Sequence, residues 1–212
     1  MRVVEGIKAP APVVGIVLAG GKSSRFGSNK ALEPIQNECL IQKVIEQLDG
    51  LFEGILVVTN RPESYAFLRC SLVKDRIEGL GPLGGIYTAL RQIYPCKAFV
   101  FPCDMPLLNR DLIRYMLEVS RDGYDILVPQ VGEGLYEPLH AIYGPKCIPA
   151  IEELIAQNRL RIFYLYSRVR VRYVKPEEIR SYDPELSCFL NINTREELNR
   201  FLSPKEDKTK GA

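Results

Sequence analysis

The chain has 212 residues, of which 46% are hydrophobic and 25% are charged, and its formal net charge is +2. This length and composition are typical of one globular α/β domain, and the small net charge gives no general attraction to nucleic acid or to a membrane surface. The six cysteines form no C-x-x-C pair, and the single histidine is His140. These counts argue against a zinc site or a redox dithiol, and a Ser-His or Cys-His nucleophile would rest on that one histidine.

Strand-like and helix-like patterns alternate along the chain, which predicts a three-layer α/β fold with a mostly parallel central sheet. We expect strands near residues 13–18, 54–59, 71–74, 97–101, 124–128, 136–143 and 168–174. Apolar residues at helical spacing predict helices around 40–48, 86–93, 112–119 and 148–155, and a closing helix from about Thr194 to Leu202. Residues 1–202 are expected to form this single domain, followed by a charged, disordered tail at 203–212.

The amino-terminal segment, residues 1–12, is too short and too weakly apolar for a signal peptide. No apolar run approaches the length that a membrane-spanning helix needs. We therefore expect a cytoplasmic protein with reduced cysteines and without a membrane partner.

The first predicted strand runs into the loop Leu18-Ala-Gly-Gly-Lys-Ser-Ser-Arg-Phe-Gly-Ser-Asn-Lys30. Glycines, hydroxyl side chains and two cations, Arg25 and Lys30, here follow a buried strand, where backbone N–H groups and fixed charges favour polyanionic ligands. A lone Gly-Gly would be read as an ordinary turn between a strand and a helix. The combination with two cations behind one strong strand instead predicts a phosphate-binding loop.

Two other nucleotide-binding patterns match only in part. The ATPase loop pattern ending in Gly21-Lys22-Ser23 requires glycine at position 16, where this chain has Ile16. Residues 79–84 spell G-x-G-x-x-G, but residues 75–78 separate them from the preceding strand, and Pro82 suits the first turn of a helix. Neither pattern is therefore taken as the nucleotide site.

Three further predicted strands end at polar side chains. Asn60 follows the second strand, and its amide offers the paired donor and acceptor that can read a nucleobase edge. Asp75 follows the third strand, shortly before a predicted helix start. Asp104 follows four strongly apolar residues, and a carboxylate beside a phosphate-binding loop is how Mg²⁺ is usually held. Each residue taken alone also suits a turn, and Asp104 also suits a helix cap.

Taken together, these residues resemble the molybdenum cofactor guanylyltransferase family, within the wider group of Rossmann-like nucleotidyltransferases. The resemblance covers nearly the whole chain, and the opening loop is specific only to the wider group. The narrower match rests on Pro102-Cys-Asp-Met-Pro-Leu107 and Phe189-Leu-Asn-Ile-Asn-Thr194, supported by Thr59-Asn-Arg61, Asp75 with Gly81-Pro-Leu-Gly-Gly85, and Glu137-Pro-Leu139. Arg195 departs from the family pattern, which commonly has proline at that place.

The resemblance implies transfer of GMP from GTP to the phosphate of molybdopterin, with release of pyrophosphate and with Mg²⁺ as cofactor. It implies that the nucleotide is bound by Leu18, Ala19, Gly20, Gly21, Lys30, Asn60, Asp75 and Asp104. Asp104 would hold the metal, and Arg25, Lys30 and Asp104 would be the catalytic residues. A phosphate acceptor is already a nucleophile at neutral pH, so the reaction needs alignment and charge neutralisation but no side-chain base.

The resemblance places Asn191 and Asn193 toward the acceptor. The alternative is that both asparagines only form the turn before the closing helix, because Thr194 and Glu197 have the spacing of a capping box. Besides GTP and molybdopterin, partners implied are other cofactor-biosynthesis proteins and chaperones of molybdoenzymes. Two alternative functions stay open: a related nucleotidyltransferase that uses CTP or a sugar phosphate, and a catalytically silent nucleotide-binding module.

An arginine-rich segment, residues 159–172, is interleaved with aromatic residues. Arg168, Arg170 and Arg172 alternate with other residues, which predicts that all three project from one face of a strand. The simplest interpretation is a solvated outer face. The alternatives are contact with the acceptor phosphate or with a protein, whereas the nearly neutral chain does not favour RNA.

Overall fold

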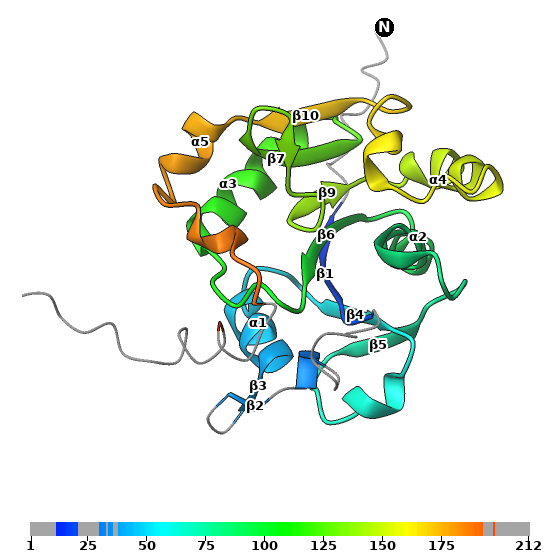
Figure 1. The fold of residues 1–212 in the computed structure, drawn as a ribbon, viewed down its shortest axis with the longest axis vertical. Helices are drawn as coiled ribbons and strands as arrows, with labels where there is room; N and C mark the ends of the chain where they lie inside the picture. The colour runs from blue at the N-terminus through cyan, green and yellow to red at the C-terminus, as the bar shows by residue number, and fades with distance from the viewer. Residues whose placement is uncertain (1–11, 21–29, 33, 36–37, 193–196, 198–212) are drawn as a thin grey trace, which may run out of the picture.

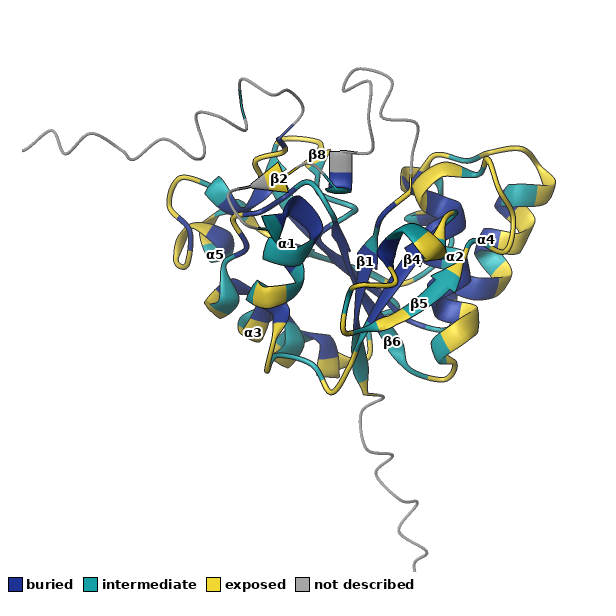
Figure 2. Cartoon of the chain, turned by 90° about the horizontal axis from the view of Figure 1, so that it is seen from below, coloured by how far each residue is buried: buried dark blue, intermediate teal, exposed yellow. Residues whose placement is uncertain are grey.

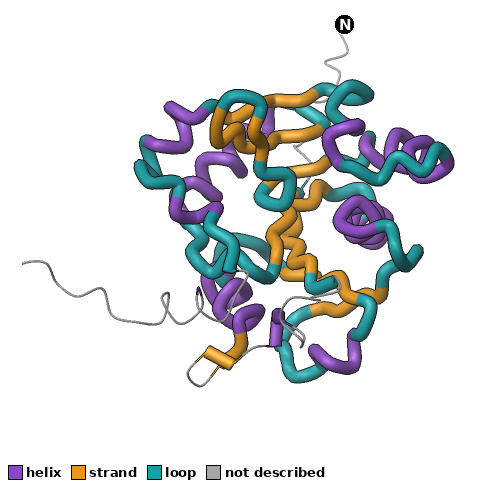
Figure 3. The backbone as a smooth tube through the Cα atoms, in the orientation of Figure 1, coloured by secondary structure: helices purple, strands orange, loops and turns teal. Residues whose placement is uncertain are grey.

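The structure is a computed structural model that describes residues 12–20, 30–32, 34–35, 38–192 and 197. Its centre is an eight-stranded mixed sheet in which seven strands follow the order β10-β7-β9-β6-β1-β4-β5, and β8 pairs with β7 (Figures 1 and 3). The strands are β1 Val13–Leu18, β4 Ile55–Thr59, β5 Ser71–Lys74, β6 Lys97–Pro102, β7 Ile126–Gly132, β8 Leu135–Tyr136, β9 Ala141–Tyr143 and β10 Val171–Val174. A separate small hairpin joins β2 Pro34–Ile35 to β3 Glu38–Cys39.

The sheet is mostly parallel, as the alternating pattern predicted. Strands β6, β1, β4 and β5 are parallel neighbours, and β7 is parallel to β10. The short strand β9 lies between β6 and β7 and is antiparallel to both. Because β9 is antiparallel to both of its neighbours, β7 runs in the same direction as β6, and β10 does so too. All six of these parallel strands therefore end at one edge of the sheet.

Helices cover both faces of the sheet, with α1, α3 and α5 on one face and α2 and α4 on the other (Figure 2). The α-helices are α1 Leu40–Leu48, α2 Gly81–Ile93, α3 Arg110–Val119, α4 Cys147–Ala156 and α5 Pro176–Arg180. Short 3₁₀ helices are η1 Lys30–Leu32, η2 Pro62–Tyr65, η3 Ser120–Asp122, η4 Ile162–Leu165 and η5 Ser187–Phe189. Among these helices, none has both the length and the apolar character needed to cross a membrane.

A hydrophobic core lies on each face of the sheet. The two cores arise because successive side chains of a buried strand point to opposite faces. In β6, Phe99 and Phe101 pack into the core beneath α1 and α3, whereas Ala98 and Val100 pack into the core beneath α2 and α4. All four side chains are buried. A strand that is apolar on both sides must be covered on both sides, so the three-layer prediction is confirmed.

Two predicted strands are shorter than expected. The segment predicted at 136–143 holds only the last residue of β8 and then β9, with a turn between them in which the N–H of His140 donates to the carbonyl of Glu137 at 3.2 Å. The strand predicted at 168–174 begins only at Val171. The prediction that three alternating arginines share one strand face is therefore wrong: Arg168 precedes β10 and pairs with Glu153, whereas Arg172 lies in β10 and pairs with Glu178.

Two further differences concern the chain after residue 174. The short helix α5 was not predicted, because five residues are too few for a helical apolar period. The predicted closing helix from Thr194 to Leu202 and the predicted tail lie outside the described residues, except for Glu197. The division into one domain and a tail therefore stays a prediction.

The single histidine is a packed core residue. The His140 ring is fully buried and makes edge contacts with Phe99, Phe101 and Phe189 at centroid distances of 5.2 to 5.6 Å. Neither ring nitrogen has a hydrogen-bond partner among the described residues. Burial lowers the pKa of His140 to about 3, so the ring is neutral near pH 7 and does not act as a general base.

This burial predicts an acid-sensitive fold. The unfolded chain gains a proton on His140 below a pKa near 6.5, whereas the folded chain does so only near 3, so stability falls as the pH decreases between these values. We expect His140→Phe to remove about 2 kcal/mol of the stability loss that the native protein shows between pH 7 and pH 5. Urea denaturation of both proteins at the two pH values measures the difference, and equal losses would contradict the assignment.

Candidate active site

The candidate site lies at the carboxyl edge of the parallel strands. Leu18 of β1 is in register with Val58 of β4 and with Pro102 of β6, and Thr59 of β4 is in register with Lys74 of β5. Residues that directly follow these strands must therefore emerge side by side. The carboxyl edge of an open parallel sheet is where α/β proteins bind ligands.

The start of the predicted phosphate-binding loop is fixed by backbone hydrogen bonds to both neighbouring strands. The N–H of Ala19 donates to the carbonyl of Val58 at 2.9 Å, and the N–H of Cys103 donates to the carbonyl of Leu18 at 3.3 Å. The Tyr65 hydroxyl donates to the carbonyl of Ala19 at 3.4 Å. Ala19 is buried whereas Gly20 is exposed, so the chain leaves the sheet at Gly20.

Gly20 brings this loop next to Asp75. A Cβ atom placed on Gly20 would lie 3.8 Å from Oδ2 of Asp75. The Asp75 N–H donates to the carbonyl of Thr59 at 3.2 Å, which holds the residue just beyond β5. Burial raises the pKa of the Asp75 carboxyl, the Thr88 hydroxyl opposes that rise, and the charge of Glu78 adds to it. The predicted neighbourhood of the loop and Asp75 is therefore present.

Asn60 occupies the position after β4, between the loop and Asp75 in the strand order. Its side-chain oxygen Oδ1 is buried and accepts no hydrogen bond from the described residues. A buried acceptor without a donor costs free energy unless a ligand or water supplies the donor. Asn60 thus has the unsatisfied hydrogen-bonding capacity that base recognition requires.

Asp104 follows β6 at the same edge. The residue is half-buried, and its backbone carbonyl accepts a hydrogen bond of 2.9 Å from the N–H of Ile192. This bond places the segment after η5, including the exposed Asn191, beside the end of β6. Asp104 and Asn191 were predicted to serve the same reaction. The hydrogen bond brings their backbone segments next to each other at this edge.

Four predicted site features cannot be placed. Gly21, Arg25 and Asn193 lie outside the described residues, as does the side chain of Lys30, whose backbone starts η1. Their roles stay predictions. The helix start predicted at Gly81-Pro82 is confirmed, because α2 begins at Gly81, and Gly79 and Gly81 both adopt positive φ angles of 87° and 61°.

Thr88 of α2 is a site residue that the sequence did not reveal. It is fully buried, and its hydroxyl donates to Oδ1 of Asp75 at 3.3 Å while accepting from the N–H of Arg76 at 3.0 Å. The hydroxyl thereby holds both the Asp75 carboxylate and the backbone of the loop that follows it at Arg76. No sequence signal identifies this role, because one threonine in an amphipathic helix is ordinary.

Thr88→Val keeps the shape of the side chain and removes its hydroxyl. We expect a loss of about 1–3 kcal/mol in unfolding free energy, because the Arg76 N–H and the Asp75 carboxylate lose a partner. GTP binding should weaken in the same variant, whereas Thr88→Ser should retain it. Urea denaturation and GTP titration measure the two effects, and a valine variant equal to the native protein in both would contradict the role.

The fold and this edge define the class of the protein. A mostly parallel three-layer sheet with a glycine loop after β1 and carboxylates after β5 and β6 is the arrangement of a Rossmann-like nucleotidyltransferase. The family model for the MobA-like NTP transferase domain matches residues 15–171. The chain belongs to this family, and it is a nucleotidyltransferase. Enzymes of this class generally use a divalent metal ion.

Relatives named for a guanylyl-transfer activity match over most of their length. The chain is 39% identical over 184 residues to the "Probable molybdenum cofactor guanylyltransferase" of Pelotomaculum thermopropionicum, covering 87% of this chain and 89% of the relative. It is 35% identical over 189 residues to the "Molybdenum cofactor guanylyltransferase" of Desulfosudis oleivorans, covering 89% and 93%. The structure of molybdopterin-guanine dinucleotide biosynthesis protein A from Archaeoglobus fulgidus superimposes with a TM-score of 0.77 at 28% identity, covering 88% and 95%.

Proposed function

We propose that this protein transfers GMP from GTP to the terminal phosphate of molybdopterin. The acceptor phosphate oxygen attacks the α-phosphorus of GTP, a new P–O bond forms, and the bond to the leaving pyrophosphate breaks. The observation that carries the proposal is the juxtaposition of Gly20, Asn60 and Asp75 at one sheet edge. The relatives that match most of the chain carry the corresponding name.

The hydrogen-bonding groups at the nucleoside end favour guanine over cytosine. The pairing edge of guanine presents two adjacent donors, N1–H and the 2-amino group, and one acceptor. The Asp75 carboxylate and the unpaired Oδ1 of Asn60 are both acceptors. Cytosine presents one donor on the same edge, so it would leave one of these two acceptors without a donor from the base.

The phosphates would lie over the loop that begins at Leu18, Ala19 and Gly20. Backbone N–H groups of this loop and the cations Arg25 and Lys30 would neutralise the phosphate charge and align the α-phosphorus for attack. No side-chain base is required, because the acceptor phosphate is already ionised. The buried, neutral His140 agrees with a reaction of this kind.

Asp104 would hold a divalent cation, for which we propose Mg²⁺. The residue fits this ion because it offers carboxylate oxygens, is half-buried at the sheet edge, and shares that edge with the loop that would bind the phosphates. When bound, such a cation polarises the phosphoryl oxygens and stabilises the charge that develops on them.

The decisive experiment compares nucleotides with purified protein and molybdopterin. We expect pyrophosphate release and label transfer from α-³²P-labelled GTP, and at least about a hundredfold lower kcat/KM with CTP or ATP. Preferential use of CTP would assign the protein to a cytidylyl branch. Binding of GTP without transfer to any acceptor would instead identify a silent nucleotide-binding module.

A further inference from the structure

The strand order divides the functional edge into two halves. Asn60 and Asp75 follow β4 and β5 on one side of β6, whereas β9, β7 and β10 lie on the other side. If the guanine lies at β4 and β5 and the reacting phosphates lie near Asp104, the half formed by β9, β7 and β10 is left for the acceptor. This step rests on the proposed function.

Glu137 stands at the boundary of this second half. The antiparallel pairing of β6 and β9 sets Val100 opposite Ala141, and Glu137 lies in the turn that leads into β9 at this edge. The Glu137 N–H donates to the carbonyl of Pro129 in β7 at 3.0 Å, and its carbonyl accepts from the His140 N–H. The backbone therefore holds Glu137 at the edge between β7 and β9.

The Glu137 carboxylate has no partner within the described part of the chain. The residue is half-buried, and neither a hydrogen bond nor an ion pair joins its carboxylate to another described residue. Burial raises its pKa, and the negative charge of Asp104 raises it further. A half-buried carboxylate in this setting gains free energy from a ligand that brings N–H donors.

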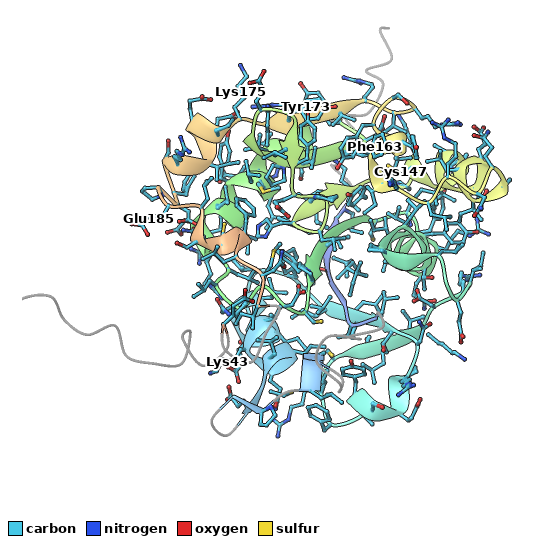
Figure 4. All side chains as sticks on the ribbon, in the orientation of Figure 1. Lys43, Cys147, Phe163, Tyr173, Lys175 and Glu185 are labelled. Carbon is cyan, nitrogen blue, oxygen red and sulfur yellow. The ribbon has the colours of Figure 1, made fainter. Side chains whose placement is uncertain are left out.

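Three tyrosines whose rings touch one another include Tyr136, the residue before Glu137, and Tyr166, whose pKa is raised by burial and also by the charge of Glu137. The ring of Tyr136 is 5.0 Å from that of Tyr173 and 5.8 Å from that of Tyr166, measured between centroids. Tyr136 immediately precedes Glu137, Tyr173 lies in β10 (Figure 4), and Tyr166 follows η4. All three residues are half-buried. We call this set the tyrosine trio.

A carboxylate beside aromatic rings matches a flat heterocycle with two adjacent donors. Aromatic side chains contact the face of such a ring, and a carboxylate accepts two neighbouring N–H groups at its edge. The 2-amino-4-oxo edge of a pterin carries N3–H and the 2-amino group in this arrangement. We propose that Glu137 and the tyrosine trio bind the pterin ring of the acceptor, with Glu137 accepting from that edge.

The test uses two ligands that differ at one position. Pterin-6-carboxylate carries the 2-amino group, and lumazine-6-carboxylate carries an oxygen instead. We expect the native protein to bind the pterin at least about tenfold more tightly, and Glu137→Gln to lose that preference, because a carboxylate accepts from the amino group and repels the oxygen. The GTP dissociation constant should not change in the variant.

Glu133→Gln is the matched control. Glu133 is an exposed residue of the turn between β7 and β8, and its replacement removes the same charge from the same hairpin. It should behave as the native protein does. Tyr136→Leu should weaken pterin binding. Tyr94→Leu should not, because Tyr94 is 69% exposed and follows the carboxyl end of α2, away from the candidate site. Thermal unfolding verifies that each variant is folded.

The outcomes separate this inference from the proposed function. If the native protein transfers GMP to molybdopterin but Glu137→Gln keeps both the pterin preference and the native KM for molybdopterin, the inference is wrong and the proposed function stands. Equal binding of pterin and lumazine by the native protein also overturns the inference. If the pterin preference is present and depends on Glu137 but no GMP is transferred, the pterin site is supported and the proposed function is wrong.

Discussion

Asp104→Asn is expected to lower kcat for guanylyl transfer by at least about a hundredfold while the protein stays folded. The amide keeps the size of the side chain but loses the charge with which the carboxylate would hold a divalent cation beside the reacting phosphates. The fold should tolerate the change, because the hydrogen bond to the Ile192 N–H is made by the backbone carbonyl of Asp104. Steady-state kinetics at saturating Mg²⁺ and thermal unfolding measure the two parts of the prediction.

Asp122→Asn is the control for this substitution. Asp122 is exposed in η3, near the start of β7 and therefore at the opposite edge of the sheet, and the same change there should leave turnover at the native value. Near-native turnover of the folded Asp104 variant would show that the carboxylate does not serve the reacting phosphates. A binding titration with Mn²⁺ in the presence of GTP gives a readout independent of turnover, and we expect weaker binding only in the Asp104 variant.

Asp75→Asn is expected to change the nucleotide preference. The Asp75 carboxylate would accept one of the two adjacent guanine donors, N1–H or the 2-amino group, whereas an asparagine amide can donate to the 2-oxo group of xanthine. We expect GTP affinity to fall by roughly 10- to 100-fold and the affinity for xanthosine triphosphate to rise relative to that for GTP. Competition titrations of the two nucleotides measure the switch.

Glu78→Gln separates the base contact from a general charge effect. Glu78 is exposed, pairs with Lys74, and acts on Asp75 only through its charge. This control should leave the preference for GTP intact. If Asp75→Asn lowers the affinity for both nucleotides to the same extent, Asp75 supports the loop beside Gly20 and does not read the base.

Much of the edge could be predicted because parallel strands end together. The apolar run before Leu18 and the one before Asp104 are unambiguous strands, and a parallel sheet brings whatever follows them to one edge. Gly20, Asn60 and Asp75 are placed there as expected. Their roles toward a nucleotide stay predictions, because their position fixes which atoms are near one another but not which ligand they bind.

The remaining features depend on contacts between distant segments. Thr88 and Asp75 meet only because α2 packs over the end of β5, and nothing in the helix period marks that contact. The predicted strand at 136–143 breaks around Pro138, which lacks the N–H that a continuing ladder would use. The break gives Glu137 its position at the edge, so the strand prediction fails at the residue for which we propose contact with the acceptor.

The hydrogen bond from the Ile192 N–H to the Asp104 carbonyl sets an order of events during synthesis of the protein. The strands that carry the residues proposed to bind the nucleotide are all made before residue 105, so they can pair while later segments are still being translated. The segment that carries Asn191 reaches Asp104 only much later. The acceptor side of the site can therefore be completed only after nearly the whole described chain has been made.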